Sequence, residues 1–181
     1  REGNDIEDIT ALYTKYQDKF KIGAAIANGA QNKSGIYAKL FKKHFNGAVS
    51  DGYFKMPEIL QKQADGEFGY NFKGADEMME FCLANGISDI TAHALIYDTE
   101  AVSKKYFYDG NDNPTMSRED ALGFIEEYIT RVMNHFNSNG DETEYTTSYK
   151  GGSIAVWDVV NEAIDDSDAH KIRENFFGKV T

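Results

Sequence analysis

Two spacings of apolar residues alternate along the chain. Four short segments are dense in small and β-branched apolar residues, which is typical of strands buried in a parallel sheet: 19–27, 47–50, 88–97 and 153–161. The segments between them repeat apolar residues every three or four positions, the period of a helix that packs on a core. Strands that alternate with helices predict βαβ units and therefore an α/β fold with a parallel sheet.

The helical spacing predicts four helices, at 5–18, 34–45, 73–85 and 117–136. Gly86 follows the third, where glycine favours a left-handed C-terminal cap. The fourth begins with Ser117 and Asp120, which resemble a capping box. Its apolar stripe is predicted to consist of Leu122, Ile125, Ile129, Val132, Met133 and Phe136.

A parallel sheet places its chemistry at the carboxyl ends of its strands. Functional side chains are therefore expected just after residues 26, 50, 97 and 160. The connection 98–116 is long and polar and follows a strand, so we predict a binding loop there. The connection 137–152 precedes a strand and is predicted to be surface decoration.

Composition narrows the class of protein. The 181 residues are 41% apolar and 13% aromatic, which fits one globular domain or a large part of one. A formal net charge of −11 disfavours nucleic acid and anionic membranes as partners. We find no membrane-spanning run, and the first residues, REGNDIED, are too polar for a signal peptide. Cys82, the single cysteine, is predicted to be a buried, unreactive thiol.

The fourth predicted strand ends in an amide and a carboxylate, Asn161 and Glu162. At a strand mouth such a pair can hydrogen-bond to a polar ligand and transfer a proton, which suits ligands rich in hydroxyl groups. From composition alone, a loop carboxylate open to water explains Glu162 as simply. Trp157, well inside the same strand, is interpreted as a packing residue.

Residues 157–163, WDVVNEA, resemble the acid/base motif of glycoside hydrolase family 10, the β-1,4-xylanases. Three further blocks are similar to segments of that family in the same order: FKIGAAI (20–26), HFNGAVS (44–50) and FGYNFKGADEMMEFCLANG (68–86). The resemblance implies a (β/α)₈ barrel and a retaining hydrolase that uses no cofactor or metal. Glu162 would be its acid/base, and Asn161 would hold the sugar at the cleaved bond.

The second strand of that family is usually followed by Glu-Asn-x-Met-Lys-Trp, and here residues 51–56 read DGYFKM. Lys55 is retained as a substrate-binding residue. Asp51 keeps the charge of a sugar-holding glutamate but has a shorter reach, and Gly52 lacks the amide. These differences leave plain xylan, branched xylan and other plant β-1,4-glycans open as substrates.

The third strand of the family ends Gly-His-Thr-Leu-Val-Trp-His, and here residues 92–98 read AHALIYD. The resemblance implies that His93 binds substrate, although a lone histidine of this kind could equally be a core residue. Tyr97 keeps an aromatic ring where the family has tryptophan. Asp98 replaces a histidine expected beside the acid/base, and we count it as a candidate substrate-binding residue.

Retaining hydrolysis needs two carboxylates about 5–5.5 Å apart. In the family the nucleophile is a glutamate near the end of the seventh strand, whereas residues 1–181 contain four predicted βα-type strands. We therefore expect residues 1–181 to be the N-terminal half of a (β/α)₈ barrel with no second domain, and to be inactive alone. Such a half exposes two strand edges and an apolar face. Its expected partners are a polysaccharide or oligosaccharide and either the remaining half barrel from a missing C-terminal segment or a second copy.

Other interpretations remain open. The altered residues after the second and third strands favour a glycan-binding module or pseudo-enzyme that does not cleave. A calcium site at DGNDNP (109–114) is disfavoured, because Pro114 stands where an EF-hand requires glycine and Asp120 where it requires glutamate. The acidic residues of 165–168 are predicted to form a solvated loop that leads into a helix, with Asp168 as its N-cap.

Aromatic rings at the strand mouths could stack on sugar rings. The candidates are Tyr53, Tyr97, Tyr106 and Tyr108, although most aromatic residues of the chain are expected in the core. The resemblance also implies an extracellular, periplasmic or cell-surface location.

Overall fold

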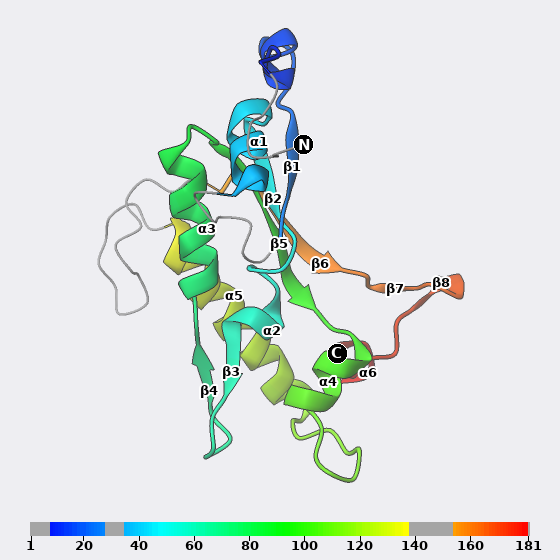
Figure 1. Cartoon of the computed structure of the whole chain (residues 1–181). Helices are drawn as coiled ribbons and strands as arrows, with labels where there is room; N and C mark the ends of the chain where they lie inside the picture. The colour runs from blue at the N-terminus through cyan, green and yellow to red at the C-terminus, as the bar shows by residue number, and fades with distance from the viewer. Residues whose placement is uncertain (1–7, 28–34, 138–153, 181) are drawn as a thin grey trace.

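The computed structural model describes residues 8–27, 35–137 and 154–180, and it contains one four-stranded parallel sheet (Figure 1). The strands lie in the order β1-β2-β5-β6, and each neighbouring pair is parallel. Their bounds are β1 Gly23–Ile26, β2 Gly47–Ser50, β5 Asp89–Tyr97 and β6 Val156–Asn161. All four predicted strands are confirmed, and the first is shorter than expected.

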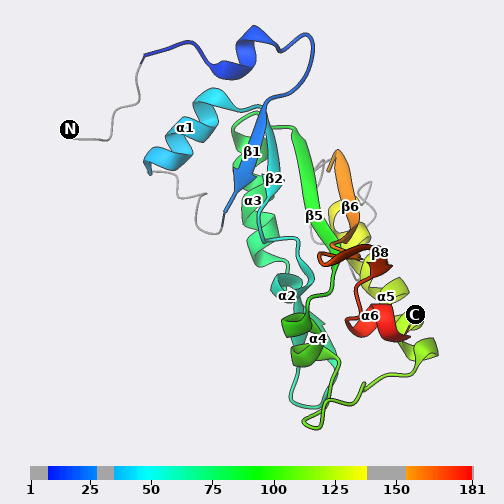
Figure 2. The same ribbon diagram turned by 90° about the vertical axis from the view of Figure 1, so that its right-hand side faces the viewer.

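Three long helices connect these strands and pack on one face of the sheet (Figures 1 and 2). They are α1 (Ile36–His44), α3 (Lys73–Ala84) and α5 (Arg118–Asn137). In chain order, α1 lies between β1 and β2, α3 between β2 and β5, and α5 between β5 and β6, so the predicted βα organisation is confirmed. None of the helices among the described residues is both long and apolar enough to cross a membrane.

The predicted helix ends agree with the structure. The Ser117 hydroxyl accepts a hydrogen bond from the Asp120 N–H at 3.1 Å and donates one to the Asp120 carboxylate at 2.7 Å. This pairing is a capping box at the start of α5. Gly86, just beyond α3, has φ +72°, the left-handed conformation that a glycine cap favours.

The apolar stripe of α5 is only partly as predicted. Val132 and Phe136 are buried, but Leu122 is 41% exposed. Ala121, Phe124 and Tyr128 are buried instead. The Phe124 ring packs against Phe107 and Phe177, and the Tyr128 ring stacks on Phe124.

The predicted helix at 5–18 is wrong for the described residues. Leu12–Lys15 form a single 3₁₀ turn, η1, and residues 5–7 lie outside the described part. Ile9 and Leu12 are about half exposed (52% and 51%), so this apolar stripe is not buried against the rest of the described structure. Without tertiary packing, a short amphipathic segment gains too little to form a stable helix.

The core lies between the sheet and its helices. Trp157 meets the ring of Phe54 edge-on at 5.9 Å, and Phe54 in turn lies 4.9 Å from Phe136. Trp157 is therefore a packing residue, as predicted.

Cys82 is buried in α3, and burial raises the pKa of its thiol to about 12, which keeps the thiol protonated and unreactive.

The predicted binding loop 98–116 contains a helix, α4 (Glu100–Tyr106), and a turn closed by a bridge between Tyr108 and Pro114. A short helix, α2 (Met56–Ile59), follows β2. It leads into an antiparallel hairpin that the sequence did not reveal, of β3 (Leu60–Lys62) and β4 (Phe68–Tyr70). Residues 138–153, which include most of the predicted surface decoration, lie outside the described part.

The acidic segment after β6 is a second hairpin and not a loop that leads directly into a helix. Its strands are β7 (Ile164–Asp165) and β8 (Asp168–Ile172), and helix α6 (Phe176–Val180) begins later. Asp168 is the first residue of β8, so the prediction of an N-cap there is wrong. The Asp165 carboxylate accepts hydrogen bonds from the N–H and hydroxyl of Ser167, which lower its pKa and close the turn.

Both margins of the sheet carry exposed apolar side chains. On the β6 side the exposed residues are Val156, Val159, Val160, Ile164 and Ile172. In α1 and the segment before β1 they are Ile9, Leu12, Tyr16, Phe20, Ile36, Tyr37 and Leu40. Within the described residues, β1 and β6 each pair on one side only. The sheet is therefore open at both edges, as expected for a half barrel.

Candidate active site

The candidate site is built at the carboxyl ends of β2, β5 and β6. Tyr97 at the end of β5 is the register partner of Asn161 at the end of β6, so these two side chains start from neighbouring backbone positions. Lys55, in the connection after β2, places its ammonium 4.8 Å from the centroid of the Tyr97 ring. This cation–π contact joins two predicted substrate-binding residues from different strands.

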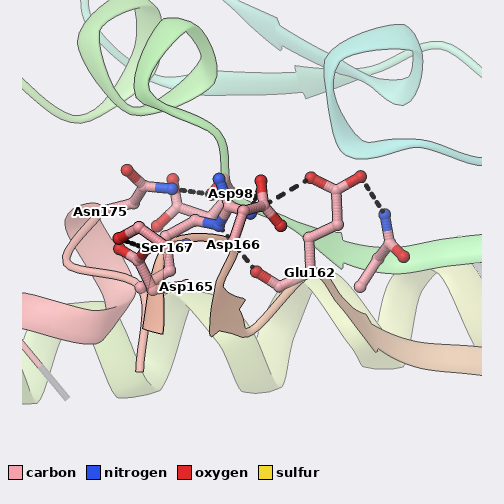
Figure 3. Close-up of polar contacts among 8 residues, drawn as sticks. Asp98, Glu162, Asp165, Asp166, Ser167 and Asn175 are labelled. Atoms are coloured by element: carbon pink, nitrogen blue, oxygen red, sulfur yellow. Dashed lines mark hydrogen bonds and ion pairs between the residues drawn. The ribbon is translucent and has the colours of Figure 1, made fainter. Parts of the chain in front are cut away.

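Glu162 stands where the chain turns out of β6. Its φ is +54°, a left-handed conformation that is uncommon for residues other than glycine. The Asn161 side-chain amide donates to the Glu162 carboxylate at 3.4 Å (Figure 3). The two residues that sequence reasoning singled out are thus in contact, and the Glu162 side chain is about half exposed (47%).

Arg173, in the connection after β8, holds this turn from the other side. Its Nε donates to the Glu162 carbonyl at 3.0 Å, and its Nη2 lies 3.7 Å from the Glu162 carboxylate and 3.1 Å from that of Asp166. The pKa of Arg173 is raised above its ordinary value, and the hydrogen bond to Asp166 is the main cause. Sequence reasoning missed Arg173, because nothing in the local pattern showed that a hairpin would bring it back to Glu162.

His93 lies deeper in the strands. It is the register partner of Asp158, and its Nδ1 lies 2.8 Å from the Asp158 carboxylate. Asp158 was not predicted as a site residue. The sequence feature that could have identified Asp158 is its carboxylate in the middle of an apolar strand. Such a carboxylate needs a polar partner when the strand packs in a sheet.

Asp98, directly after β5, accepts hydrogen bonds from three groups of the protein itself. Its carboxylate accepts hydrogen bonds from the Ser103 hydroxyl and, at 2.8 Å, from the Phe177 N–H. Its carbonyl accepts one from the Asn175 side-chain amide (Figure 3). Burial raises the pKa of this carboxyl group, and the two hydrogen bonds partly oppose that effect. Asp98 also lines a cavity of about 260 Å³ together with Asn161 and Glu162. It thus borders the same region as the acid/base candidate but is engaged in joining α4 to α6.

The remaining candidates divide between surface and core. Asp51 is exposed at the end of β2. Tyr53 and Tyr106 are buried, and the Tyr106 hydroxyl donates to the Leu60 carbonyl at 3.0 Å, so both are core residues. Tyr108 is half-buried, with the Lys179 ammonium 6.0 Å from its ring centroid.

Asp109 opens the segment that suggested calcium. Its carboxylate accepts hydrogen bonds from the N–H groups of Asn111 and Asn113, which lower its pKa. In the described part of the chain, no group of three or more His, Cys, Asp or Glu side chains could hold a metal ion.

The sequence profile of glycosyl hydrolase family 10 matches residues 11–181. The chain belongs to this family. Among curated family 10 relatives, endo-1,4-beta-xylanase A of Thermoanaerobacterium saccharolyticum is 33% identical over 165 residues, which are 91% of this chain and 13% of that protein. Endo-1,4-beta-xylanase B of Paenibacillus barcinonensis is 27% identical and is matched over 88% of this chain and 41% of its own length.

Solved structures of family 10 agree with the fold. The intracellular xylanase of T. saccharolyticum superimposes with a TM-score of 0.74 at 26% identity, over 97% of this chain and 49% of that one. Xylanase XynB of P. barcinonensis gives a TM-score of 0.67 at 28% identity, over 93% and 44%. The chain thus spans about half the length of these solved relatives, and the prediction of the N-terminal part of a family 10 (β/α)₈ barrel is confirmed.

Proposed function

We propose that this chain carries the acid/base half of a retaining endo-β-1,4-xylanase site that acts on xylan or a related plant β-1,4-glycan. The observation that supports it best is the pair Asn161–Glu162, in contact at the mouth of a barrel strand. Family membership supports the reaction class. Structures of mutants of the T. saccharolyticum xylanase in complex with xylotriose and xylotetraose support the substrate class.

In this reaction Glu162 acts twice. It donates a proton to the glycosidic oxygen as the bond to the leaving sugar breaks, and it then removes a proton from the water that releases the bound sugar. Its exposed position at the strand mouth suits exchange of that proton with water. Asn161, His93, Lys55 and Tyr97 are proposed to hold the sugar, with Asp51 and Asp98 at the margin.

The second carboxylate, the nucleophile, is proposed to come from strands other than these four. In family 10 it belongs to the seventh strand, and the open edges of β1 and β6 are where further barrel strands would pair. The remaining half barrel is therefore the proposed protein partner. An extracellular, periplasmic or cell-surface location stays a prediction, and one solved relative is described as intracellular.

A glycan-binding role without cleavage is the second candidate. Two observations favour it: Gly52 offers no side chain after β2, and the Asp98 carboxylate is already engaged by Ser103 and Phe177.

The purified 181-residue chain is expected to release no reducing sugar from xylan, since without a nucleophile no covalent glycosyl-enzyme can form. A reducing-sugar assay with a sensitive end point measures this, with Glu162→Gln as the control. Release of sugar by the unmodified chain that Glu162→Gln abolishes would contradict the proposal.

Binding is tested separately by calorimetry with xylotriose and xylotetraose. We expect weak binding that Asn161→Ala reduces. If the unmodified chain and Asn161→Ala give the same heats, the assignment of the sugar-holding role to Asn161 is wrong.

A further inference from the structure

His93 and Asp158 form a pair across β5 and β6, and an ionised Asp158 carboxylate determines which nitrogen of the His93 ring must carry a hydrogen. The His93 Nδ1 and the Asp158 Oδ2 are 2.8 Å apart. An ionised carboxylate can only accept a hydrogen bond, so the ring nitrogen that faces it must carry the hydrogen. In a neutral ring, Nε2 is then a bare acceptor.

The other ring nitrogen of His93, Nε2, is available to a ligand. Nε2 has no hydrogen-bond partner among the described residues, although the ring lies within a packed strand pair. The side chains of His93 and Asp158 are 25% and 44% exposed, so both reach solvent. A buried structural histidine would have both nitrogens satisfied by protein, as far as geometry allows.

We propose that Asp158 is a positioning residue of the site: it fixes the Nδ1–H tautomer of His93 and so presents Nε2 as the acceptor for a sugar hydroxyl. The inference rests on the proposed function and deepens it, because it adds a residue and assigns the direction of a hydrogen bond. It predicts a preference for ligands that place a hydroxyl donor at this position.

The electrostatic alternative is that Asp158 acts only through its charge. An Asp158→Asn substitution distinguishes the positioning role from the electrostatic role. An asparagine carbonyl still accepts from Nδ1–H but carries no charge, whereas alanine removes both acceptor and charge.

The test combines ring-nitrogen NMR with calorimetry on the full chain. In ¹⁵N-labelled protein, at a pH where the imidazole is neutral, the two ring nitrogens of His93 report which one carries hydrogen. We expect Nδ1–H in the unmodified chain and in Asp158→Asn, and loss of that preference in Asp158→Ala. Xylotetraose binding should weaken about three- to tenfold in Asp158→Ala and less in Asp158→Asn, which is the size of effect expected from one misoriented hydrogen bond.

Asp89→Asn is the matched control, since it removes the same charge from the first residue of β5, the strand that carries His93. It should leave both the tautomer and the binding unchanged. An Nε2–H tautomer in the unmodified chain, or an unchanged tautomer in Asp158→Ala, overturns the inference. A changed tautomer with unchanged binding, or an equal loss of binding in Asp158→Asn and Asp158→Ala, also overturns it.

The tautomer measurement needs no sugar, so the two proposals fail separately. If the unmodified chain shows Nδ1–H but binds no oligosaccharide, the proposed function is contradicted. The sugar-binding part of the inference then falls with it, and the pairing of Asp158 with His93 stands confirmed.

Discussion

Asp98 is the single residue whose structural role differs most from what its position suggested. The expectation was a substrate contact, and the structure shows a carboxylate that accepts from Ser103 and Phe177. Replacing it with alanine removes the acceptor for both groups. We expect Asp98→Ala to lower the free energy of unfolding by about 2 kcal/mol, the usual result of leaving a partly buried donor unpaired. Urea unfolding followed by circular dichroism measures this.

The raised pKa of Asp98 gives a second, independent prediction. Because burial raises the pKa above its ordinary 3.8, the folded protein holds this proton more tightly than the unfolded chain does. The resulting stabilisation is present at low pH and is lost as the pH rises through the raised value. Relative to Asp98→Asn, the unmodified chain should therefore lose stability as the pH increases above 3.8.

Urea midpoints across a pH series test this dependence. Asp112→Asn, which changes an exposed carboxylate on the turn after α4, serves as the control. A difference between the unmodified chain and Asp98→Asn that does not vary with pH, or one that varies in the opposite direction, contradicts the assignment.

The candidate site residues were predicted from contiguous sequence signals, and their roles stay predictions. Asn161, Glu162 and Lys55 belong to short motifs, and the structure brings Lys55 to Tyr97 and Asn161 to Glu162. Arg173 and Asp158 were not predicted as site residues, because each meets its partner through a hairpin or a neighbouring strand. Such pairings depend on register, which a single sequence does not specify.

At the scale of elements, the cap of α5 offers the most direct test. The Ser117 hydroxyl satisfies the N–H of Asp120 in the first turn. Ser117→Ala removes that acceptor and is expected to cost about 1 kcal/mol of unfolding free energy. Chemical denaturation measures the loss. Ser117→Thr retains a hydroxyl and should recover most of it, so equal destabilisation by both substitutions would exclude capping as the cause.

The sequence predicted the strands and long helices well, but it did not predict which helix faces are buried or that a hairpin follows β6. Strands and long helices follow from periodicity, and α1, α3 and α5 lie close to their predicted bounds. Which side of a helix is buried depends on its neighbours, so Leu122 is exposed while Phe124 and Tyr128 are buried. The β7–β8 hairpin was missed because its polar turn, centred on Asp166, also fits a loop.

At the scale of the whole molecule, the dominant feature is the edge of β6 that has no partner strand among residues 8–27, 35–137 and 154–180. Val156, Val159 and Val160 are each about half exposed along this edge (48%, 52% and 58%). An edge of this kind favours association with another chain. We expect the chain to self-associate as its concentration rises, and Val156→Lys to reduce that association. Sedimentation velocity over a concentration series measures it.

Leu122→Lys is the matched control, because it introduces the same charge at a residue of similar exposure (41%) on α5, away from the strand edge. If both substitutions reduce association equally, net charge explains the effect. If neither does, the β6 edge is not the surface through which copies meet.

The contacts that hold Glu162 join residues no more than eleven positions apart: Asn161, Glu162 and Arg173. Short loops close rapidly and at a small entropic cost, whereas pairing with distant strands is slow. During synthesis on the ribosome, this turn can form soon after Arg173 emerges. Glu162, the proposed proton donor, would then be held in its orientation early, before the proposed partner carboxylate from a distant strand joins the site.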